Sequence, residues 1–290
     1  MSEQYTRRGF LKRAFGYSIG TLFTISFGYT YARYIEPEQL EINRFNISST
    51  LVPKGFNGIK ILQFSDTHIG HYYNEEQFKE LITTINQQEA DMVFFTGDLI
   101  DAPDLYENPS QLIPLLSAIN APLGKFSIYG NHDHGGYGTE SYKQIMEQSG
   151  FELLVNSSTS ISINNESITI AGLDDYMLGR PDFEQTLRPI PEGEYTILLA
   201  HEPDVAKISH SYPVHLQLSG HSHGGQIKLP LYGAIVTPPY ANDYVEGFYE
   251  IGSVPLTLYV NRGLGTTRIP LRFLSKPEIS IFTLKSGEPT

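Results

Sequence analysis

Five apolar stretches of the chain each end in side chains that can bind a metal ion. Because the crevice of an open α/β sheet lies beyond the carboxyl ends of its strands, these side chains converge if the strands are parallel neighbours. The chain has no cysteine, which excludes thiolate ligands and disulfides. We therefore expect a metal centre made of carboxylate, amide and imidazole groups: Asp66 with His68, Asp98, Asn131 with His132, His201, and His221 with His223.

The number of candidate ligands indicates two ions. Without His132 the set has seven members, whereas one ion holds roughly four to six ligands. Two ions that share a bridging carboxylate fit the set better. Oxygen and imidazole ligands suit manganese, zinc or iron. Two such ions about 3.5–4 Å apart can hold a phosphate oxygen and generate hydroxide at neutral pH, so the expected chemistry is phosphoester hydrolysis.

The segment from Tyr129 to Asp133 is ambiguous when it is taken alone. Asn, His and Asp are common in polar turns for backbone reasons. In an active site, however, Asn131 can offer its carbonyl oxygen to a metal, and His132 can donate a proton near neutral pH. Asp133 can orient that histidine. The four other ligand segments favour the active-site interpretation.

The elements that must position these ligands follow from hydrophobic patterning. Strands are expected just before the ligand segments, at residues 59–64, 92–95, 124–129, 195–200 and 216–218, and an edge strand at 42–47. Helices are expected at 75–88, 110–119, 140–148 and 203–208. Antiparallel meanders are expected at 151–155, 160–163 and 168–172, and a mostly stranded tail at 244–283. This pattern predicts an α/β (α+β) sandwich of two mixed sheets flanked by helices.

The first 35 residues differ from the rest of the chain. They carry five basic residues and one acid, whereas the whole chain has a formal charge of -12. Arg7-Arg8 precedes an uncharged run, Ala14 to Ala32, and the arrangement resembles a twin-arginine export signal. The run is also nominally long enough to span a bilayer, so a membrane anchor through residues 14–32 stays open. We expect a signal or anchor at 1–35 and a catalytic domain at 36–290.

The charge distribution and the N-terminal segment also define the expected partners and location. An acidic body repels phosphate backbones, so no nucleic-acid partner is expected. The export signal implies the twin-arginine translocation machinery as a partner. It places the protein in the cell wall, outside the cell, or on a membrane facing away from the cytoplasm.

Taken together, the ligand segments resemble the signature of the calcineurin-like metallophosphoesterases, in the same order along the chain. The matching segments are Asp66-x-His68, Gly97-Asp98, Gly130-Asn131-His132-Asp133, His201 and Gly220-His221-Ser222-His223. The resemblance implies a four-layer αββα sandwich with two divalent ions. It implies that Asp66, His68, Asp98 and His223 hold the first ion. Asp98, Asn131, His201 and His221 would hold the second.

The resemblance also assigns roles around His132. It implies that His132 binds no metal and protonates the leaving oxygen, and that Asp101, three residues after Asp98, orients it. Asp101 thereby displaces Asp133, although it can also be a simple helix cap.

Three substrate contacts are weaker expectations. Arg262 lies in a glycine-containing loop that can bring a guanidinium to a phosphate. A surface ion pair is the alternative. His71 and His134 lie close to the site in sequence. Asp174-Asp175 is expected to be a turn.

The substrate is expected from the wider resemblance. The export signal, His223-Gly224-Gly225-Gln226 and Asn261-Arg262-Gly263-Leu264-Gly265 are similar to an exported bacterial branch of the family and to membrane-associated diacylglucosamine pyrophosphatases. This similarity implies that metal-activated hydroxide cleaves a phosphodiester or pyrophosphate in a lipid-linked or cell-envelope substrate. The alternatives are a nuclease or nucleotide phosphodiesterase, and a non-catalytic scaffold, which the complete ligand set disfavours.

Overall fold

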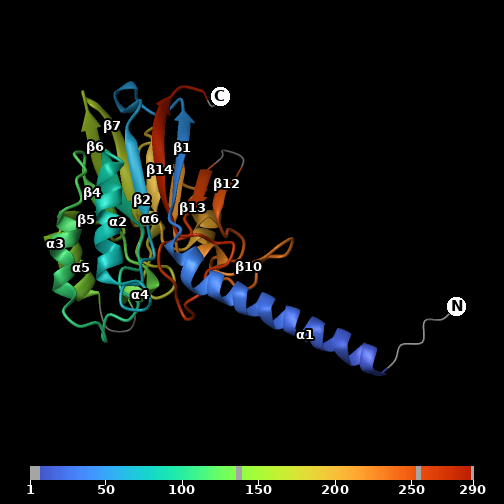
Figure 1. The fold of residues 1–290 in the computed structure, drawn as a ribbon. Coiled ribbons are helices and arrows are strands. Elements are labelled where there is room, and N and C mark those ends of the chain that lie inside the picture. Colours follow the sequence, from blue (N-terminus) through green and yellow to red (C-terminus); the bar gives the residue numbers. More distant parts are fainter. Residues whose placement is uncertain (1–6, 135–138, 253–255, 289–290) are drawn as a thin grey trace.

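The computed structural model describes residues 7–134, 139–252 and 256–288, and two large sheets form its centre (Figure 1). Within the first sheet, β14 runs antiparallel to β2, and the other neighbours are parallel. The last strand of the chain therefore lies between the first two. The strand order is β1 (Glu41–Ser49), β14 (Glu278–Ser286), β2 (Lys60–Phe64), β3 (Met92–Phe95), β4 (Lys125–Ser127) and β5 (Phe151–Leu153).

The second sheet is built from the later part of the chain. Its four central strands are parallel, and an antiparallel strand lies at each edge. A two-stranded hairpin, β10 (Lys228–Leu229) with β11 (Gly233–Ala234), lies outside both sheets. The order in the second sheet is β12 (Gly247–Ile251), β13 (Leu256–Val260), β9 (Leu216–Ser219), β8 (Thr196–Leu199), β7 (Glu166–Gly172) and β6 (Ser157–Ile163).

Helices cover the outer face of each sheet. The first sheet packs against α2 (Glu75–Gln87), α3 (Leu112–Ser117) and α5 (Glu140–Gln148), and the second against α6 (Phe183–Leu187) and α7 (Ala206–Ser209). A third apolar layer, between the sheets, includes Phe94 and Leu218. Three apolar layers separate four layers of structure, so the predicted αββα sandwich is confirmed.

Helix α2 illustrates why these elements form where they do. The side chain of Asn74 accepts a hydrogen bond from the backbone of Gln77, whose own side chain bonds back to the backbone of Asn74. This capping box satisfies the free N–H groups at the helix start. The buried residues recur at helical spacing and pack on the first sheet: Phe78, Leu81, Ile82 and Ile85.

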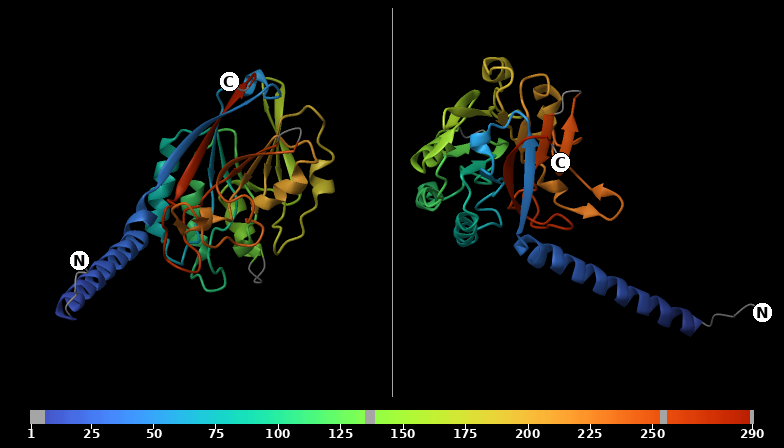
Figure 2. Two further views of the ribbon diagram at one scale, coloured as in Figure 1. Left: turned by 90° about the vertical axis from the view of Figure 1, so that its right-hand side faces the viewer. Right: turned by 90° about the horizontal axis from the view of Figure 1, so that it is seen from above.

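The N-terminal helix α1 (Arg7–Thr30) projects away from the sandwich and has no buried residue (Figures 1 and 2). A π-helical turn, Tyr31–Ile35, and a 3-10 turn, Glu36–Glu38, connect it to β1. These turns attach to the domain, because the Arg272 backbone N–H donates to the carbonyl of Ala32 at 2.9 Å. Along the described residues, no helix combines the length and apolarity needed to cross a membrane.

Two details of the expected topology are wrong. Residues 151–155 were expected in an antiparallel meander, but β5 joins the first sheet parallel to β4, because α5 supplies the crossover that a parallel connection needs. The tail at 244–283 was expected to be mostly strand, but residues 261–277 form a loop with one isolated bridge, between Ile227 and Phe273. The side chain of Arg272 bonds carbonyls of this loop at Arg262, Gly265 and Ser275. The meander of β6 and β7 is as predicted.

Candidate metal centre

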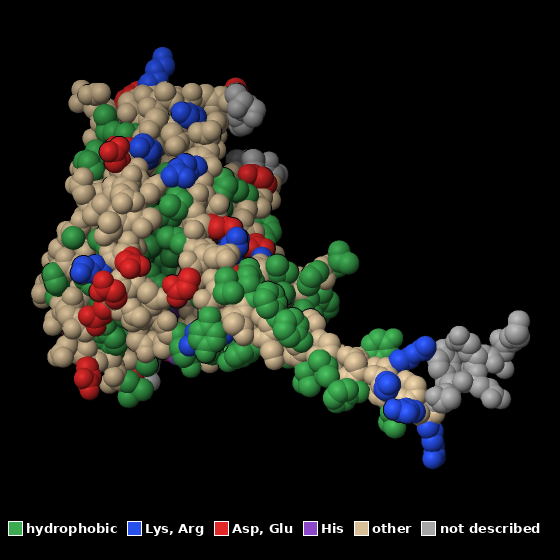
Figure 3. Space-filling model, viewed as in Figure 1, with side chains coloured by type: hydrophobic (Ala, Val, Ile, Leu, Met, Phe, Trp, Pro, Cys, Tyr) green, Lys and Arg blue, Asp and Glu red, His purple; other side chains and the backbone are tan. Residues whose placement is uncertain are grey.

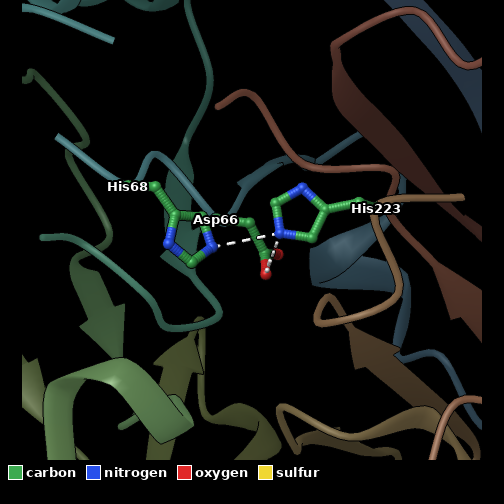
Figure 4. Close-up of side chains that lie close together, drawn as sticks. All are labelled: Asp66, His68 and His223. Atoms are coloured by element: carbon green, nitrogen blue, oxygen red, sulfur yellow. Dashed lines mark hydrogen bonds and ion pairs between the residues drawn. The ribbon is translucent and has the colours of Figure 1, made fainter. Parts of the chain in front are cut away.

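The carboxyl ends of parallel strands from both sheets deliver the predicted ligands to one place. Strands β2, β3 and β4 lead into Asp66 with His68, Asp98, and Asn131, while β8 and β9 lead into His201, and His221 with His223. Figure 4 shows Asp66 and His68 from the first sheet pointing toward His223 from the second. The centre is therefore an interface between sheets, where each sheet supplies part of the set.

The ligand atoms form overlapping groups. Among described residues, Asp66, His68 and His223 form one group, and Asp98, His201 and His221 form another. A third group, His68, Asp98 and His132, shares a residue with each of them. His68 Nε2 lies 3.0 Å from His223 Nε2. The Oδ2 atom of Asp98 lies 3.5 Å from His68 Nε2 and 3.3 Å from His201 Nε2. Asp98 thus lies between the two groups.

In three of the histidines, a contact between one ring nitrogen and a neighbouring oxygen atom determines which nitrogen faces the cluster. The Nδ1 atom of His201 contacts the carbonyl of Thr96 at 2.6 Å, and His68 Nδ1 contacts Asp101 Oδ1 at 3.0 Å. His221 instead uses Nε2, which lies 2.9 Å from the carbonyl of Pro239. In each case the opposite nitrogen is left free for the cluster, as in histidines that bind metals.

Two buried polar atoms of the cluster have no hydrogen-bond partner. They are His201 Nε2 and Asn131 Oδ1. An unpaired buried polar atom costs about 1–3 kcal/mol, so such atoms are rare without a purpose. A divalent cation would satisfy both atoms. The donor set therefore fits metal ions that prefer nitrogen and oxygen ligands.

Five candidate ligands have left-handed backbone conformations, which are uncommon outside glycine. Their φ angles lie between 45° and 67°. Such residues cost energy and persist only where surrounding bonds hold them. One such bond runs from the backbone N–H of His221 to the carboxylate of Asp66, at 3.0 Å. The five residues are Asp66, His68, Asp98, His221 and His223.

The charges of the cluster favour an ionised carboxylate at its centre. Burial would raise the pKa of Asp98, but the imidazoles of His201, His132 and His68 outweigh burial and hold it well below its usual value. Burial likewise opposes a charge on His201, yet Asp98 and Asp66 hold the His201 pKa well above its usual value. Without a metal, a proton on His201 therefore balances Asp98.

The other two imidazoles of the second sheet are neutral. Burial and the neighbouring charge of His201 lower the pKa of His221 to about 3. Burial, His68 and Arg272 also hold the pKa of His223 well below its usual value. A metal ion needs unprotonated imidazole and ionised carboxylate. His221 and His223 are already in that state.

His132 lies beside the cluster on α4 (Asn131–His134). It contacts the expected residue, Asp101, but through the backbone carbonyl and not through the carboxylate. Its Nδ1 atom contacts the backbone carbonyl of Asp101 at 2.6 Å, whereas the Asp101 carboxylate is 3.7 Å away. That carboxylate lies nearer to His68. Burial opposes a charge on His132, but Asp98 and the Asp101 carbonyl raise its pKa overall.

The carboxylate of Asp133 holds backbone groups of two loops together. It accepts backbone N–H groups from Asp98 at 2.8 Å, Gly130 at 2.8 Å and Leu99 at 3.1 Å. It therefore joins the loops after β3 and β4. The two loops also approach closely at Gly130, where a Cβ atom would clash with Asp98.

The three weaker substrate-binding expectations are placed around the cluster. Arg262 pairs with Glu278 at 2.6 Å and Glu41 at 2.8 Å, which is the ion-pair alternative considered for it. His134 Nε2 contacts Asp174 Oδ1 at 2.7 Å. His71 Nδ1 lies 3.6 Å from Asp101. None of these three side chains lines the pocket over the cluster.

The sequence analysis did not identify Arg272, which lies next to the ligand cluster and contacts His223. This arginine is fully buried, and its Nη2 atom lies 3.3 Å from His223 Nδ1. Burial lowers its pKa to about 10. A lone arginine between Leu271 and Phe273 was a detectable signal, because a buried charge needs partners.

A pocket of about 360 Å³ opens over the cluster. Its floor includes His68, Asp98, Asn131, His132, His221 and His223. One wall is apolar, and Arg268 lies beside it. The apolar residues are Met177, Ile227, Ile235, Val236, Pro238, Pro239 and Ile269.

Comparisons with known proteins agree with this geometry. The sequence profile of the Calcineurin-like phosphoesterase family matches residues 59–225. The chain is 53% identical over 285 residues to the metallophosphoesterase YkuE of Bacillus subtilis, which covers 98% of this chain and 99% of that one. It is 28% identical to the UDP-2,3-diacylglucosamine pyrophosphatase LpxG of Chlamydia trachomatis, over 87% of this chain and 92% of that one.

The solved structures to which the chain is similar are more distant in sequence. One is the NAD nucleotidase of Haemophilus influenzae, which is 15% identical with a TM-score of 0.48, over 71% of this chain and 50% of that one. Another is a dimetal phosphatase from Danio rerio, which is 11% identical with a TM-score of 0.42, over 72% of this chain and 88% of that one. The profile match and the 53% identity over nearly the whole chain are decisive: the chain belongs to the calcineurin-like phosphoesterases, a family of metal-dependent hydrolases.

Proposed function

We propose that this hydrolase uses two divalent ions to cleave a phosphodiester or pyrophosphate bond in a lipid-linked or cell-envelope substrate. The observation that carries the proposal is the position of Asp98. Its carboxylate lies between an imidazole of each ligand group, at 3.5 Å and 3.3 Å. A shared carboxylate is the expected feature of a two-ion centre.

The ligands divide between the ions as the resemblance implies. Asp66, His68, Asp98 and His223 hold the first ion. Asp98, Asn131, His201 and His221 hold the second, and the unpartnered atoms His201 Nε2 and Asn131 Oδ1 support this division. The ions are manganese, zinc or iron, given the absence of thiolates. When bound, they generate hydroxide from water at neutral pH and offset the charge of a phosphate.

His132 is the proposed acid for the leaving oxygen. Its Nδ1 atom contacts the carbonyl of Asp101, so Nδ1 carries a proton, and Nε2 is left for the pocket. The raised His132 pKa favours the charged form, in which Nε2 also carries a proton that it can donate. Asp101 acts as a positioning residue through that carbonyl, and its carboxylate orients His68.

The substrate class rests on the pocket and on one relative. A wall of aliphatic and proline side chains beside the ligand cluster suits a substrate with an apolar part. LpxG, by its name, acts on a diacylated pyrophosphate. A nuclease remains the alternative, but the charge of -12 opposes a nucleic-acid substrate.

The N-terminal segment completes the proposal. Arg7-Arg8 and the uncharged run from Ala14 to Ala32 support export by the twin-arginine route, with residues 1–35 as signal or anchor. Helix α1 has no buried residue, so loss of α1 alone would expose no core, whereas Ala32 in the turn after it is buried and accepts a hydrogen bond from Arg272. The folded domain would then work outside the cytoplasm.

One experiment tests the chemistry and the bond type together. The purified chain is stripped by chelator, reloaded with manganese or zinc, and assayed side by side on a phosphomonoester, a phosphodiester and a nucleotide-sugar pyrophosphate. We expect metal-dependent turnover of the diester or the pyrophosphate. An absence of metal-dependent turnover on all three substrates would contradict the proposal, and a strong monoester preference would correct the bond type.

A further inference from the structure

The β10–β11 hairpin and the loop beside it carry a concentration of exposed apolar side chains. Tyr232 is 75% exposed and Val236 is 66% exposed. Figure 3 shows hydrophobic side chains gathered where the hairpin projects, and again along helix α1. We call the following residues the apolar rim: Leu229, Leu231, Tyr232, Ile235, Val236 and Ile269. Exposed apolar patches on soluble domains usually mark an interaction site.

The rim continues into the pocket over the ligand cluster. Ile235, Val236 and Ile269 belong to both, since each is at least 45% exposed and also lines the apolar wall. The outward side of the hairpin and the inward wall of the pocket are therefore one apolar surface. A molecule with an apolar tail could pass from the rim to the cluster without crossing a polar barrier.

The charge around the rim differs from that of the rest of the chain. The chain has 32 acidic residues, but residues 224–242 and 263–275 contain none. They contain Lys228, which pairs with Glu246, the buried Arg272, and Arg268, which is exposed at the pocket edge. The rim therefore has no acidic side chain of its own that an anionic surface would repel.

The rim and helix α1 are connected to the same part of the domain, through Phe273. The backbone of Lys228 donates to Phe273, and the ring of Phe273 lies against Tyr31 at a centroid distance of 6.1 Å. Helix α1 therefore leaves the domain beside the hairpin (Figure 1). Basic residues at its far end suit the headgroups of the same surface: Arg7, Arg8, Lys12 and Arg13.

We propose that the apolar rim docks onto an anionic lipid surface and holds the pocket mouth against it. Aliphatic and tyrosine side chains suit shallow insertion at the boundary between headgroups and acyl chains. The rim then delivers the apolar part of a membrane-held phosphate ester along the wall to the ligand cluster. The role of docking in substrate delivery rests on the proposed hydrolase activity. Docking itself can be measured without any turnover.

The absence of cysteine in the sequence allows a direct test on the full chain. Tyr232→Cys places an environment-sensitive fluorophore on the rim, and Ser158→Cys places the same label on an exposed position of β6, an edge strand of the second sheet that is not part of the rim. Vesicles contain phosphatidylglycerol and phosphatidylcholine, or phosphatidylcholine alone. We expect a blue shift at position 232 with the anionic vesicles and no shift at position 158.

A second variant connects docking to substrate access. Leu231→Asp with Tyr232→Asp should lower binding to anionic vesicles by about tenfold or more, since both side chains would carry charge into the interface. Residue 231 has a left-handed backbone, which aspartate tolerates. Leu105→Asp is the matched control, because Leu105 is equally apolar and 78% exposed but lies outside the rim.

The activity of the same variants separates the two proposals. Neither Leu231 nor Tyr232 lines the pocket, so hydrolysis of a water-soluble diester should stay unchanged while hydrolysis of a vesicle-embedded ester falls. A blue shift without any hydrolysis would keep docking and remove the hydrolase. No shift at position 232, or equal shifts at both positions, would overturn docking. Sedimentation that shows a Leu231-dependent dimer would also overturn it, in favour of contact between two chains.

Discussion

Two acidic and histidine-containing clusters lie side by side in this protein, and they use the same segments differently. Residues 131–134 supply Asn131 to the ligand cluster and His134 to the other one. Residues 201 and 202 divide in the same way. Glu202 lies beside Asp175, whose backbone N–H donates to Asp174. We call this second group, His134, Asp174, Asp175 and Glu202, the loop cluster.

The difference lies in where the lone pairs point. In the loop cluster, carboxylates accept backbone N–H groups: Glu202 from Tyr176 and Met177, and Asp174 from Arg180. Burial and Asp175 raise the pKa of Glu202 to about 8, so that side chain is neutral at pH 7. In the ligand cluster, the Nε2 atoms of His68 and His223 face each other at 3.0 Å, and Asn131 Oδ1 has no hydrogen-bond partner. Burial and charge alone therefore do not identify a metal site, whereas convergent lone pairs do.

From the comparison of the two clusters, we expect the largest loss of metal binding and activity when Asp98 is replaced. Asp98→Ala should remove both metals and lower turnover by more than about a hundredfold, because loss of even an outer-shell partner costs about 10–100-fold. Metal content by mass spectrometry and hydrolysis of an activated diester check this. Asp174→Ala is the matched control from the loop cluster and should keep both metals. Equal metal loss in the two variants would remove the distinction between the clusters.

A smaller effect is expected at His132, which separates chemistry from metal binding. His132→Ala should lower kcat by about 10²–10⁴-fold, the usual contribution of a general acid. Two metals per chain should remain bound, since His132 is not a proposed ligand. Metal analysis and steady-state kinetics are measured on the same preparation. A loss of metal in this variant would make His132 a ligand.

Replacing Asp101 should mainly lower enzymatic activity, whereas replacing Asp133 should mainly lower the stability of the fold. Asp101→Asn should lower turnover about 10–100-fold, because the Asp101 carboxylate orients His68. Asp133→Asn should lower the free energy of unfolding by about 1–3 kcal/mol, since an amide replaces one oxygen that accepts backbone N–H groups. Kinetics and urea unfolding on both variants test this. A larger activity loss in Asp133→Asn than in Asp101→Asn would contradict this separation.

The smallest effect concerns the pair of His134 with Asp174. Burial opposes a charge on His134, but Asp174 raises its pKa above the ordinary 6.5. The stabilisation is therefore complete below about pH 6.5 and is lost as the pH rises through the raised pKa. His134→Gln should cost about 1 kcal/mol at pH 6 and almost nothing at pH 9. Urea unfolding at both pH values measures this, and a cost independent of pH would contradict it.

Much of the architecture could be predicted from hydrophobic runs. Short apolar runs such as Met92-Val93-Phe94-Phe95 are strands whatever surrounds them, and α2 has caps and spacing that specify it locally. The pairing of β5 could not be predicted, because a three-residue strand carries no information about its sheet. The loop at 261–277 depends on Arg272, whose bonds to distant carbonyls replace a strand ladder.

The convergence of the candidate ligands could be predicted because metal ligands must have particular side chains, and their order along the chain is informative. The groups around them are harder to predict. His132 is held by a main-chain carbonyl, which every residue possesses and no sequence reveals. The weaker candidate Arg262 is held by Glu41 and Glu278, which are far from it in sequence. The apolar rim is visible only when the hairpin is seen beside the pocket.

The position of β14 has a consequence for how the molecule is made. Residues 278–286 are inserted between β1 and β2, so β1 reaches the rest of its sheet only through the final strand. A chain still emerging from the ribosome can pair β2 with β3 and β4, but it leaves β1 unattached until β14 has been made. Strand β1 is therefore synthesised before β2 but joins the sheet after it.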